Sequence, residues 1–167
     1  MRVRDVLAES IKGKRGCLSA KDVRKVLGIN ASVLQQWLAR DLIPFETIDV
    51  GKRTWRRFAI LDLPRLVVIG EIVAQGLPVG EAVENVDTIL DWKYKPGTVP
   101  GVILWLRQIK TIYFMVASES VAAVLREYDC ASCILFSVDE LKLKIAAVVR
   151  ENEGTRFRMK VQATVLP

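Results

Sequence analysis

Two short amphipathic segments joined by a glycine constrain the fold of this 167-residue chain more than any other feature. The first begins at Ser19, which forms a capping-box pattern with Asp22, and Gly28 fits the left-handed position that ends a helix. Asn30 or Ser32 can cap the second segment. Its apolar residues recur at helical spacing, at Val33, Leu34, Trp37 and Leu38. The pattern predicts a helix, a tight turn and a second helix.

A basic hairpin is predicted directly after these helices. Residues 45–50 alternate loosely, Gly51-Lys52 suits a turn, and residues 54–58 would form the return strand. Further helices are expected over 63–75 and 79–91. Two short helices followed by an Arg-rich hairpin are how a small domain places one helix in a DNA groove.

The positive charge of the chain is concentrated in the same region. The net charge is +6, and residues 1–67 hold 14 Lys or Arg against 7 Asp or Glu. Residues 68–110 hold 4 against 5, and residues 111–167 hold 7 against 7. A solvated basic face explains such charge by itself, but its coincidence with the helices and hairpin favours a nucleic-acid partner.

A series of glycine and apolar residues runs through the two predicted helices: Gly28, Ile29, Val33, Leu34, Trp37, Leu42 and Ile43. The hairpin adds a second series: Gly51, Trp55, Arg56, Arg57 and Phe58. With the later helices, joined by GLPVGEAV, these residues resemble the MerR family of winged helix-turn-helix regulators over residues 18–90. The resemblance implies an α+β fold in which the second helix enters DNA and the hairpin is a wing.

Three departures from the family pattern bear on this resemblance. Gln35 stands where the family usually has Arg, and Asp41 stands where it usually has Gly. Many members continue into one long antiparallel dimer helix, whereas the Pro- and Gly-rich residues 93–101 interrupt any such helix here. The standard dimer is therefore not expected. A homo-oligomer, most simply a dimer, is still expected because a single winged domain contacts few base pairs.

Polar residues of the second helix have the chemistry to read DNA bases. Gln pairs with adenine through two hydrogen bonds and Ser suits either groove edge, so Ser32, Gln35 and Gln36 are the candidate readers. The candidate phosphate contacts are Arg40, Lys52, Arg53, Arg56 and Arg57. For each residue the alternative is a solvated surface position. Trp37 and Trp55 are expected to pack in the core and the wing instead of stacking on bases.

Residues 93–101 are expected to link an N-terminal domain, residues 1–92, to a second unit, residues 102–167. The final segment alternates apolar and polar residues as a half-exposed strand does. The predicted elements of the second unit are a helix over 103–109, a strand over 112–117, a helix over 119–128, a strand over 132–138, a helix over 141–152 and a strand over 157–165. This β-α-β-α-β-like order describes a small α/β unit that mediates self-association, binds a protein partner or holds an effector.

Catalysis is not expected. The chain has no His, its carboxylates are scattered along predicted helix surfaces, and no glycine-rich phosphate loop follows a strand. Cys130 and Cys133 form a Cys-x-x-Cys pair that can chelate a metal or act in redox chemistry, but a four-ligand site needs two more groups. Buried free thiols are the preferred interpretation, so neither a metal nor a cofactor is predicted.

Neither a membrane segment nor a disulfide scaffold is predicted. The longest apolar runs are too short to span a bilayer, Asp5 and Glu9 interrupt the N-terminal apolar stretch, and the cysteines are odd in number. We expect a cytoplasmic protein that binds double-stranded DNA sequence-specifically, as a transcriptional regulator does. The alternative is a protein-binding adaptor built on the winged scaffold, which would show no steep salt dependence on DNA.

Overall fold

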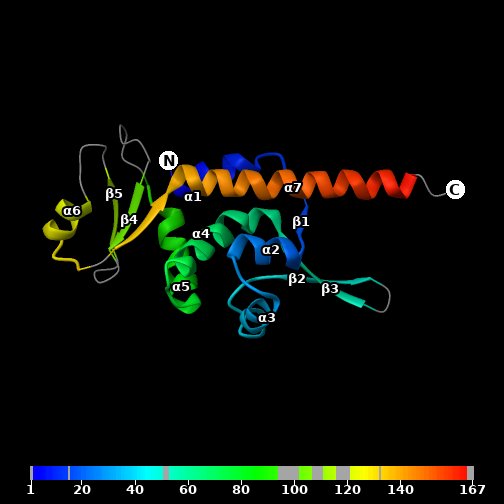
Figure 1. The fold of residues 1–167 in the computed structure, drawn as a ribbon, viewed down its shortest axis with the longest axis horizontal. Helices are drawn as coiled ribbons and strands as arrows, with labels where there is room; N and C mark the ends of the chain where they lie inside the picture. Colours follow the sequence, from blue (N-terminus) through cyan, green and yellow to red (C-terminus); the bar gives the residue numbers. More distant parts are fainter. Residues whose placement is uncertain are drawn as a thin grey trace.

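The computed structural model describes residues 2–14, 16–50, 53–93, 102–106, 111–115, 121–131 and 133–164. Helices and small antiparallel sheets make up an α+β architecture (Figure 1). The elements in chain order are α1 (Val3–Ala8), η1 (Glu9–Ile11), β1 (Cys17–Leu18), α2 (Ala20–Leu27), α3 (Ala31–Ala39), β2 (Glu46–Val50), β3 (Arg53–Ala59), η2 (Ile60–Asp62), α4 (Leu63–Ala74), α5 (Val79–Asp91), β4 (Val102–Leu106), β5 (Thr111–Met115), α6 (Val121–Glu127), β6 (Ile134–Ser137) and α7 (Val138–Thr164). In the described part of the chain, no helix is both long and apolar enough to cross a membrane.

Local hydrogen bonds begin and end α2 and α3 as the sequence predicts. The backbone N–H of Ser19 donates to Asp22 Oδ2 at 2.8 Å, and the backbone N–H of Asp22 donates to Ser19 Oγ at 3.3 Å. Gly28 ends α2 with a φ of +67°. The Asn30 side chain accepts a hydrogen bond from the backbone N–H of Val33 at 2.9 Å, which settles the open choice of N-cap for α3 in favour of Asn30. The predicted helix, turn and helix are confirmed.

Helix α3 ends at a left-handed residue that is not glycine. Asp41 has a φ of +53°. Its backbone N–H donates to the Leu38 carbonyl at 3.2 Å, and the backbone N–H of Leu42 donates to the Trp37 carbonyl at 3.0 Å. These two bonds form a Schellman motif, in which the left-handed position is usually glycine. Asp is one of the few other residues that adopt this conformation, because its short side chain can hydrogen-bond locally.

Two three-stranded antiparallel sheets are described, with strand orders β1-β3-β2 and β5-β4-β6. In the first sheet β2 and β3 form the predicted hairpin, with Glu46 opposite Arg57. In the second sheet β4 is central, and Trp105 lies opposite Ile112 on one side and Ile134 on the other. Both sheets pair antiparallel strands, so the described chain contains no parallel β-α-β unit.

Two predictions for the C-terminal part are wrong. The spacing of residues 103–109 predicts a helix, but residues 102–106 form β4, because hydrogen bonds to two neighbouring strands outweigh the local preference. The alternation over 157–165 predicts a strand, but residues 138–164 form one helix, α7. A strand needs a neighbour to satisfy its backbone, whereas an existing helix gains about one hydrogen bond for each added residue. The β-α-β-α-β-like order is therefore replaced by an antiparallel sheet followed by a long helix.

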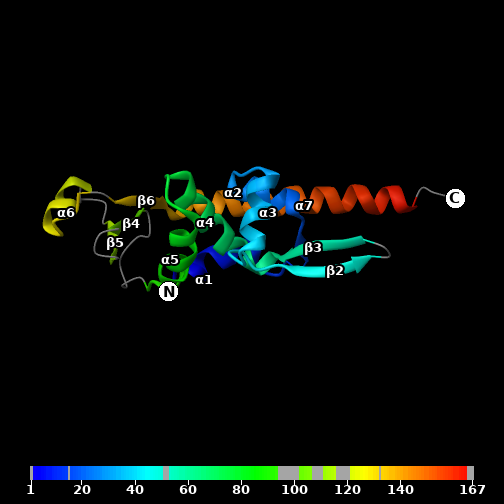
Figure 2. The same ribbon diagram turned by 90° about the horizontal axis from the view of Figure 1, so that it is seen from below.

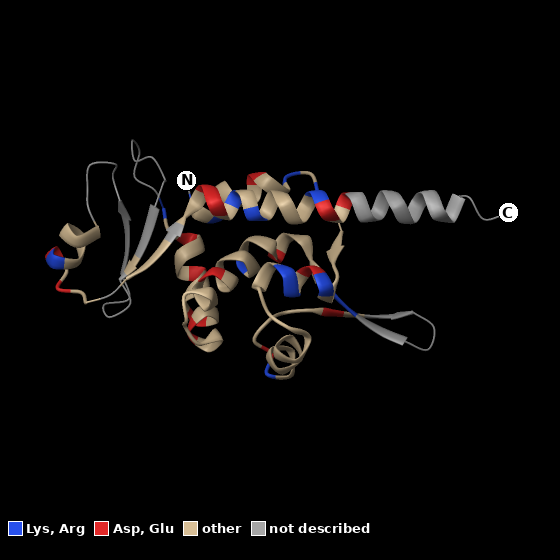
Figure 3. Ribbon diagram, viewed as in Figure 1, with Lys and Arg blue, Asp and Glu red and all other residues tan. Residues whose placement is uncertain are grey.

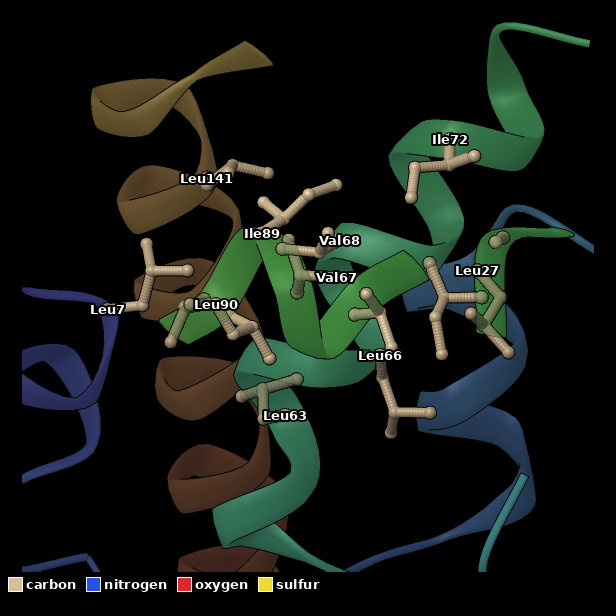
Figure 4. Close-up of a cluster of buried hydrophobic side chains, with 14 of the residues drawn as sticks. Leu7, Leu27, Leu63, Leu66, Val67, Val68, Ile72, Ile89, Leu90 and Leu141 are labelled. Atoms are coloured by element: carbon tan, nitrogen blue, oxygen red, sulfur yellow. The ribbon is translucent and has the colours of Figure 1, made fainter. Parts of the chain in front are cut away.

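Helix α7 lies beside α1, α2 and α4 and shares their core (Figures 1 and 2). The buried residues Leu141, Ile145 and Val149 of α7 belong to the same cluster as Leu7 of α1 and Ile72 of α4. Figure 4 shows side chains from the N-terminal helices and Leu141 gathered in this cluster. Residues from both sides of the predicted linker thus contribute to one cluster, and residues 94–101 of that linker lie outside the described structure.

Ion pairs also join α7 to the N-terminal residues. Lys25 Nζ of α2 lies 2.6 Å from Glu151 Oε1, and Lys14 Nζ lies 2.6 Å from Glu153 Oε1. All four side chains are well exposed, so each pair adds at most about 1 kcal/mol to stability. Apolar burial therefore contributes more than these pairs to holding α7 in place.

Candidate nucleic-acid interface

One face of α3 is open to solvent. The opposite face is held in the core by Leu34, Trp37 and Leu38, which are at most 8% exposed. Because these residues recur at helical spacing, the helix turns its polar residues outward. The exposed residues include Ser32, Gln35, Gln36 and Arg40. All three predicted base readers and one predicted phosphate contact therefore share one face.

Arg56 of β3 lies against this face. Its Nη1 donates a hydrogen bond to Gln35 Oε1. Its Cζ lies 5.1 Å from the centroid of the Phe45 ring, and that ring packs on buried Phe58 with a centroid distance of 6.4 Å. A hydrogen bond and a cation–π contact thus hold the guanidinium beside the helix. We call the exposed face of α3, Ser32, Gln35, Gln36, Ala39 and Arg40, together with Arg56, the α3 surface.

Arg57 does not belong to the α3 surface. Successive residues of a strand project to opposite faces of the sheet, so Arg57 points the other way from Arg56. It is half-buried and lines a cavity with residues of α2 and α7. The structure thus separates two arginines that the sequence analysis treats as one set of phosphate contacts.

Three other residues named from the sequence lie partly or wholly outside the described structure. Lys52 is not among the described residues, and only the backbone of Arg53 and Trp55 in β3 is described. Their predicted contacts stay predictions. Trp37, in contrast, is 8% exposed and packs in the core, which confirms its predicted structural role.

Many cations of residues 1–67 are already paired within the protein. Arg4 Nη2 lies 3.2 Å from Asp91 Oδ1, and Arg65 Nη1 lies 2.5 Å from Asp87 Oδ2, so acidic residues of α5 neutralise them. Blue segments mark Lys and Arg along α2, at the end of α3 and at the base of the hairpin (Figure 3). Among the residues with described side chains, those without an ion-pair partner in this region are Lys21, Arg24, Arg40, Arg56 and Arg57.

Lys21 and Arg24 are not among the contacts predicted from the sequence. Both lie on α2 at an i, i+3 spacing, where Lys21 is exposed and Arg24 is half-buried. The i, i+3 spacing was the signal in the sequence, because residues three positions apart are neighbours on a helix surface. The spacing within α2 does not show that Arg57 of β3 lines the same cavity as these two cations.

The Cys-x-x-Cys pair lies beside α6, at the far end of the molecule from α3 (Figure 1). Cys130 is 6% exposed and packs with Val124. Burial raises the pKa of the Cys133 thiol, and the neighbouring Cys130 raises it further. Because the thiolate is the form that attacks and binds metals, a raised pKa works against both. Within the described residues, no three His, Cys, Asp or Glu side chains gather to hold a metal ion.

Comparison with known proteins does not assign a function to these residues. No protein-family model matches the chain, and no curated protein matches it.

Proposed function

We propose that this protein binds duplex DNA through the α3 surface, as a winged helix-turn-helix protein similar to the MerR family. The observation that carries the proposal is a continuous polar stripe on α3, Ser32, Gln36 and Arg40, flanked by Arg56. A helix whose exposed face carries amide and hydroxyl groups suits the base edges of the major groove. Cations at the end and side of that helix suit the phosphates on either side of the groove.

The backbone supports the likeness to this family. The family pattern has glycine at the positions of Gly28 and Asp41, and both residues have a positive φ, +67° and +53°. The pattern at these two positions therefore reflects a backbone requirement of the turns, which Asp41 also meets. The departure at Asp41 does not count against a winged helix-turn-helix.

Gln35 and Gln36 are proposed to act differently. The amide oxygen of Gln35 already accepts a hydrogen bond from Arg56, so this residue positions the guanidinium. Pairing with adenine needs both the oxygen and the nitrogen of an amide. Gln36 is exposed and lies one turn beyond Ser32, in the middle of the polar stripe. We assign base reading to Gln36 and Ser32, and positioning to Gln35.

Sequence-specific binding by such a domain suits transcriptional control. A single α3 reaches only a few base pairs, so the proposal includes two copies of the chain on adjacent half-sites. Two copies on adjacent half-sites would read enough base pairs for specific binding without the long antiparallel dimer helix of many MerR family members.

Reversing the charge of Arg56 is expected to weaken binding to every DNA sequence. For Arg56→Glu we expect an affinity lower by about tenfold, and a salt slope of log K lower by about one, because one phosphate contact is lost. The measurement is fluorescence anisotropy of a labelled random-sequence duplex titrated with the full chain at several NaCl concentrations. Arg126→Glu, on exposed α6 away from α3, is the matched control and should bind as the wild type does.

Two results would contradict this assignment. Equal affinities for the wild type and both variants would remove Arg56 from the DNA interface. An absence of salt-dependent binding by the wild type itself would favour the alternative, a protein-binding adaptor on the same scaffold.

Removing the Gln36 side chain is expected to reduce specificity more than affinity. On a duplex selected from a random library, Gln36→Ala should lose about 1–3 kcal/mol of binding free energy, with little loss on random DNA. Gln35→Ala should weaken both duplexes by a similar factor, because it releases Arg56 and leaves base reading intact. Competition of selected against random duplex measures the ratio for each variant. A larger loss of specificity in Gln35→Ala would exchange the two roles.

A further inference from the structure

A cavity of about 570 Å³ lies between α2, β3 and α7, on the opposite side of β3 from the α3 surface. Lys21 and Arg24 reach it from α2, Arg57 from β3 and Asn152 from α7. Three elements that are distant in sequence thus build one concave site. Its volume falls within the range of small-molecule sites in proteins, about 300–1,000 Å³.

The acidic groups of this cavity are occupied. Asp22 Oδ2 accepts hydrogen bonds from the backbone N–H of Ser19 at 2.8 Å and from Ser19 Oγ at 2.6 Å, as part of the α2 cap. Both carboxylate oxygens of Glu151 accept from Lys25 Nζ, at 2.6 Å and 2.7 Å. These two carboxylates therefore have partners other than the remaining cations of the cavity.

Three cations and one buried amide donor of the lining remain. Lys21, Arg24 and Arg57 have no ion-pair partner among the described residues, and both arginines are half-buried. The Asn152 Nδ2 atom is buried and makes no hydrogen bond within the described structure. An unpaired buried donor carries a free-energy cost. Asn152 lines the cavity, so a turn of its side chain toward an acceptor there would remove this cost.

We propose that this cavity binds a phosphate-bearing anion. Guanidinium groups bind phosphate oxygens through paired hydrogen bonds. The charged side chains of the lining, Lys21, Arg24, Lys25 and Arg57 against Asp22 and Glu151, leave a positive excess that matches a ligand with two or more negative charges. The cavity is larger than a single phosphate needs, so a diphosphate or a small phosphorylated molecule fits it. The same chemistry is presented by a phosphate of the DNA backbone, and the experiment distinguishes these two sources. The proposal does not rest on DNA binding by the α3 surface.

The test is calorimetric titration of the full chain with inorganic pyrophosphate at constant ionic strength. Saturable binding is expected, and Arg24→Gln and Arg57→Gln should each weaken it at least tenfold. Arg40→Gln removes a cation of the α3 surface and is the matched control, which should bind pyrophosphate as the wild type does. No saturable binding by the wild type, or equal binding by all four proteins, would overturn the proposal.

Asn152→Leu separates a binding role from a structural one. Replacing an unpaired buried amide with an apolar side chain of similar size should leave the melting temperature unchanged or raise it, because no hydrogen bond is lost. The same variant should bind pyrophosphate several-fold more weakly. A variant that melts as the wild type does and also binds pyrophosphate equally would exclude Asn152 from the site and contradict the proposed donor set.

The source of the phosphate is decided by adding a labelled duplex. If pyrophosphate displaces the duplex, and Arg57→Gln weakens both ligands by the same factor, the cavity takes a backbone phosphate. If the duplex stays bound at saturating pyrophosphate, the cavity takes a free phosphorylated molecule. Either result supports an anion site. Because the pyrophosphate titration contains no DNA, it can succeed where the proposed DNA binding fails, and the reverse also holds.

Discussion

Ile145→Ala in α7 is expected to lower the free energy of unfolding by about 2–5 kcal/mol. Ile145 is fully buried, in the cluster that also contains Leu7 of α1 and Ile72 of α4. Truncation removes apolar surface from that cluster and leaves a cavity, which the surrounding helices can fill only in part. The measurement is urea unfolding of the full chain, followed by circular dichroism.

Leu143→Ala is the matched control for this prediction. Leu143 lies on the same helix and is 65% exposed, so its truncation should change the free energy of unfolding by less than about 0.5 kcal/mol. Because α7 and the N-terminal helices share one core, we also expect one unfolding transition for the wild type. Similar small effects of both substitutions would contradict the packing of α7 on α1 and α4.

Gly70→Val in α4 is expected to lower the free energy of unfolding by about 3 kcal/mol, although valine favours a helix more than glycine does. A Cβ atom at Gly70 would lie 2.9 Å from the Val26 carbonyl oxygen and 3.1 Å from Leu27 Cα, both in α2. These are backbone atoms and cannot rotate away, so α2 and α4 would have to move apart. Thermal or urea unfolding measures the loss.

Gly80→Val in α5 tests whether the Gly70 effect comes from close packing. A Cβ atom at Gly80 has no neighbour within 4 Å, so this substitution should leave stability within about 0.5 kcal/mol of the wild type. Since α2 precedes the turn into α3, Gly70→Val should also weaken duplex binding, whereas Gly80→Val should not. Equal stability of the two variants would show that the close approach of α2 and α4 is not needed.

Elements with local signals could be predicted from the sequence. Ser19 and Asp22 cap α2 through contacts within one turn, and Gly28 ends it because few other residues adopt a positive φ. The hairpin of β2 and β3 and the helices α4 and α5 also follow from short-range patterns. The exposed face of α3 is a consequence of the spacing of Leu34, Trp37 and Leu38, so the exposure of its polar residues follows from the sequence.

Elements that depend on distant partners could not be predicted in the same way. Residues 102–106 become a strand because β5 and β6 flank them. The outer edge of β6 is covered by a side chain, since Gln75 Nε2 of the α4 C-cap donates to the Leu135 carbonyl at 2.9 Å and Gln75 Oε1 accepts from the Leu135 N–H at 3.4 Å. No pattern within either segment contains this pairing.

The sequence by itself determined the α2–turn–α3 unit, the hairpin and the set of polar residues on α3, because caps, turns and helical periodicity act within a few residues. Only the tertiary structure decided how those residues divide. It placed Arg56 against Gln35 and turned Arg57 toward α2 and α7. It also neutralised Arg4 and Arg65 with acids of α5 and packed α7 on the N-terminal core. These outcomes depend on contacts between residues far apart in the chain, which periodicity and composition do not encode.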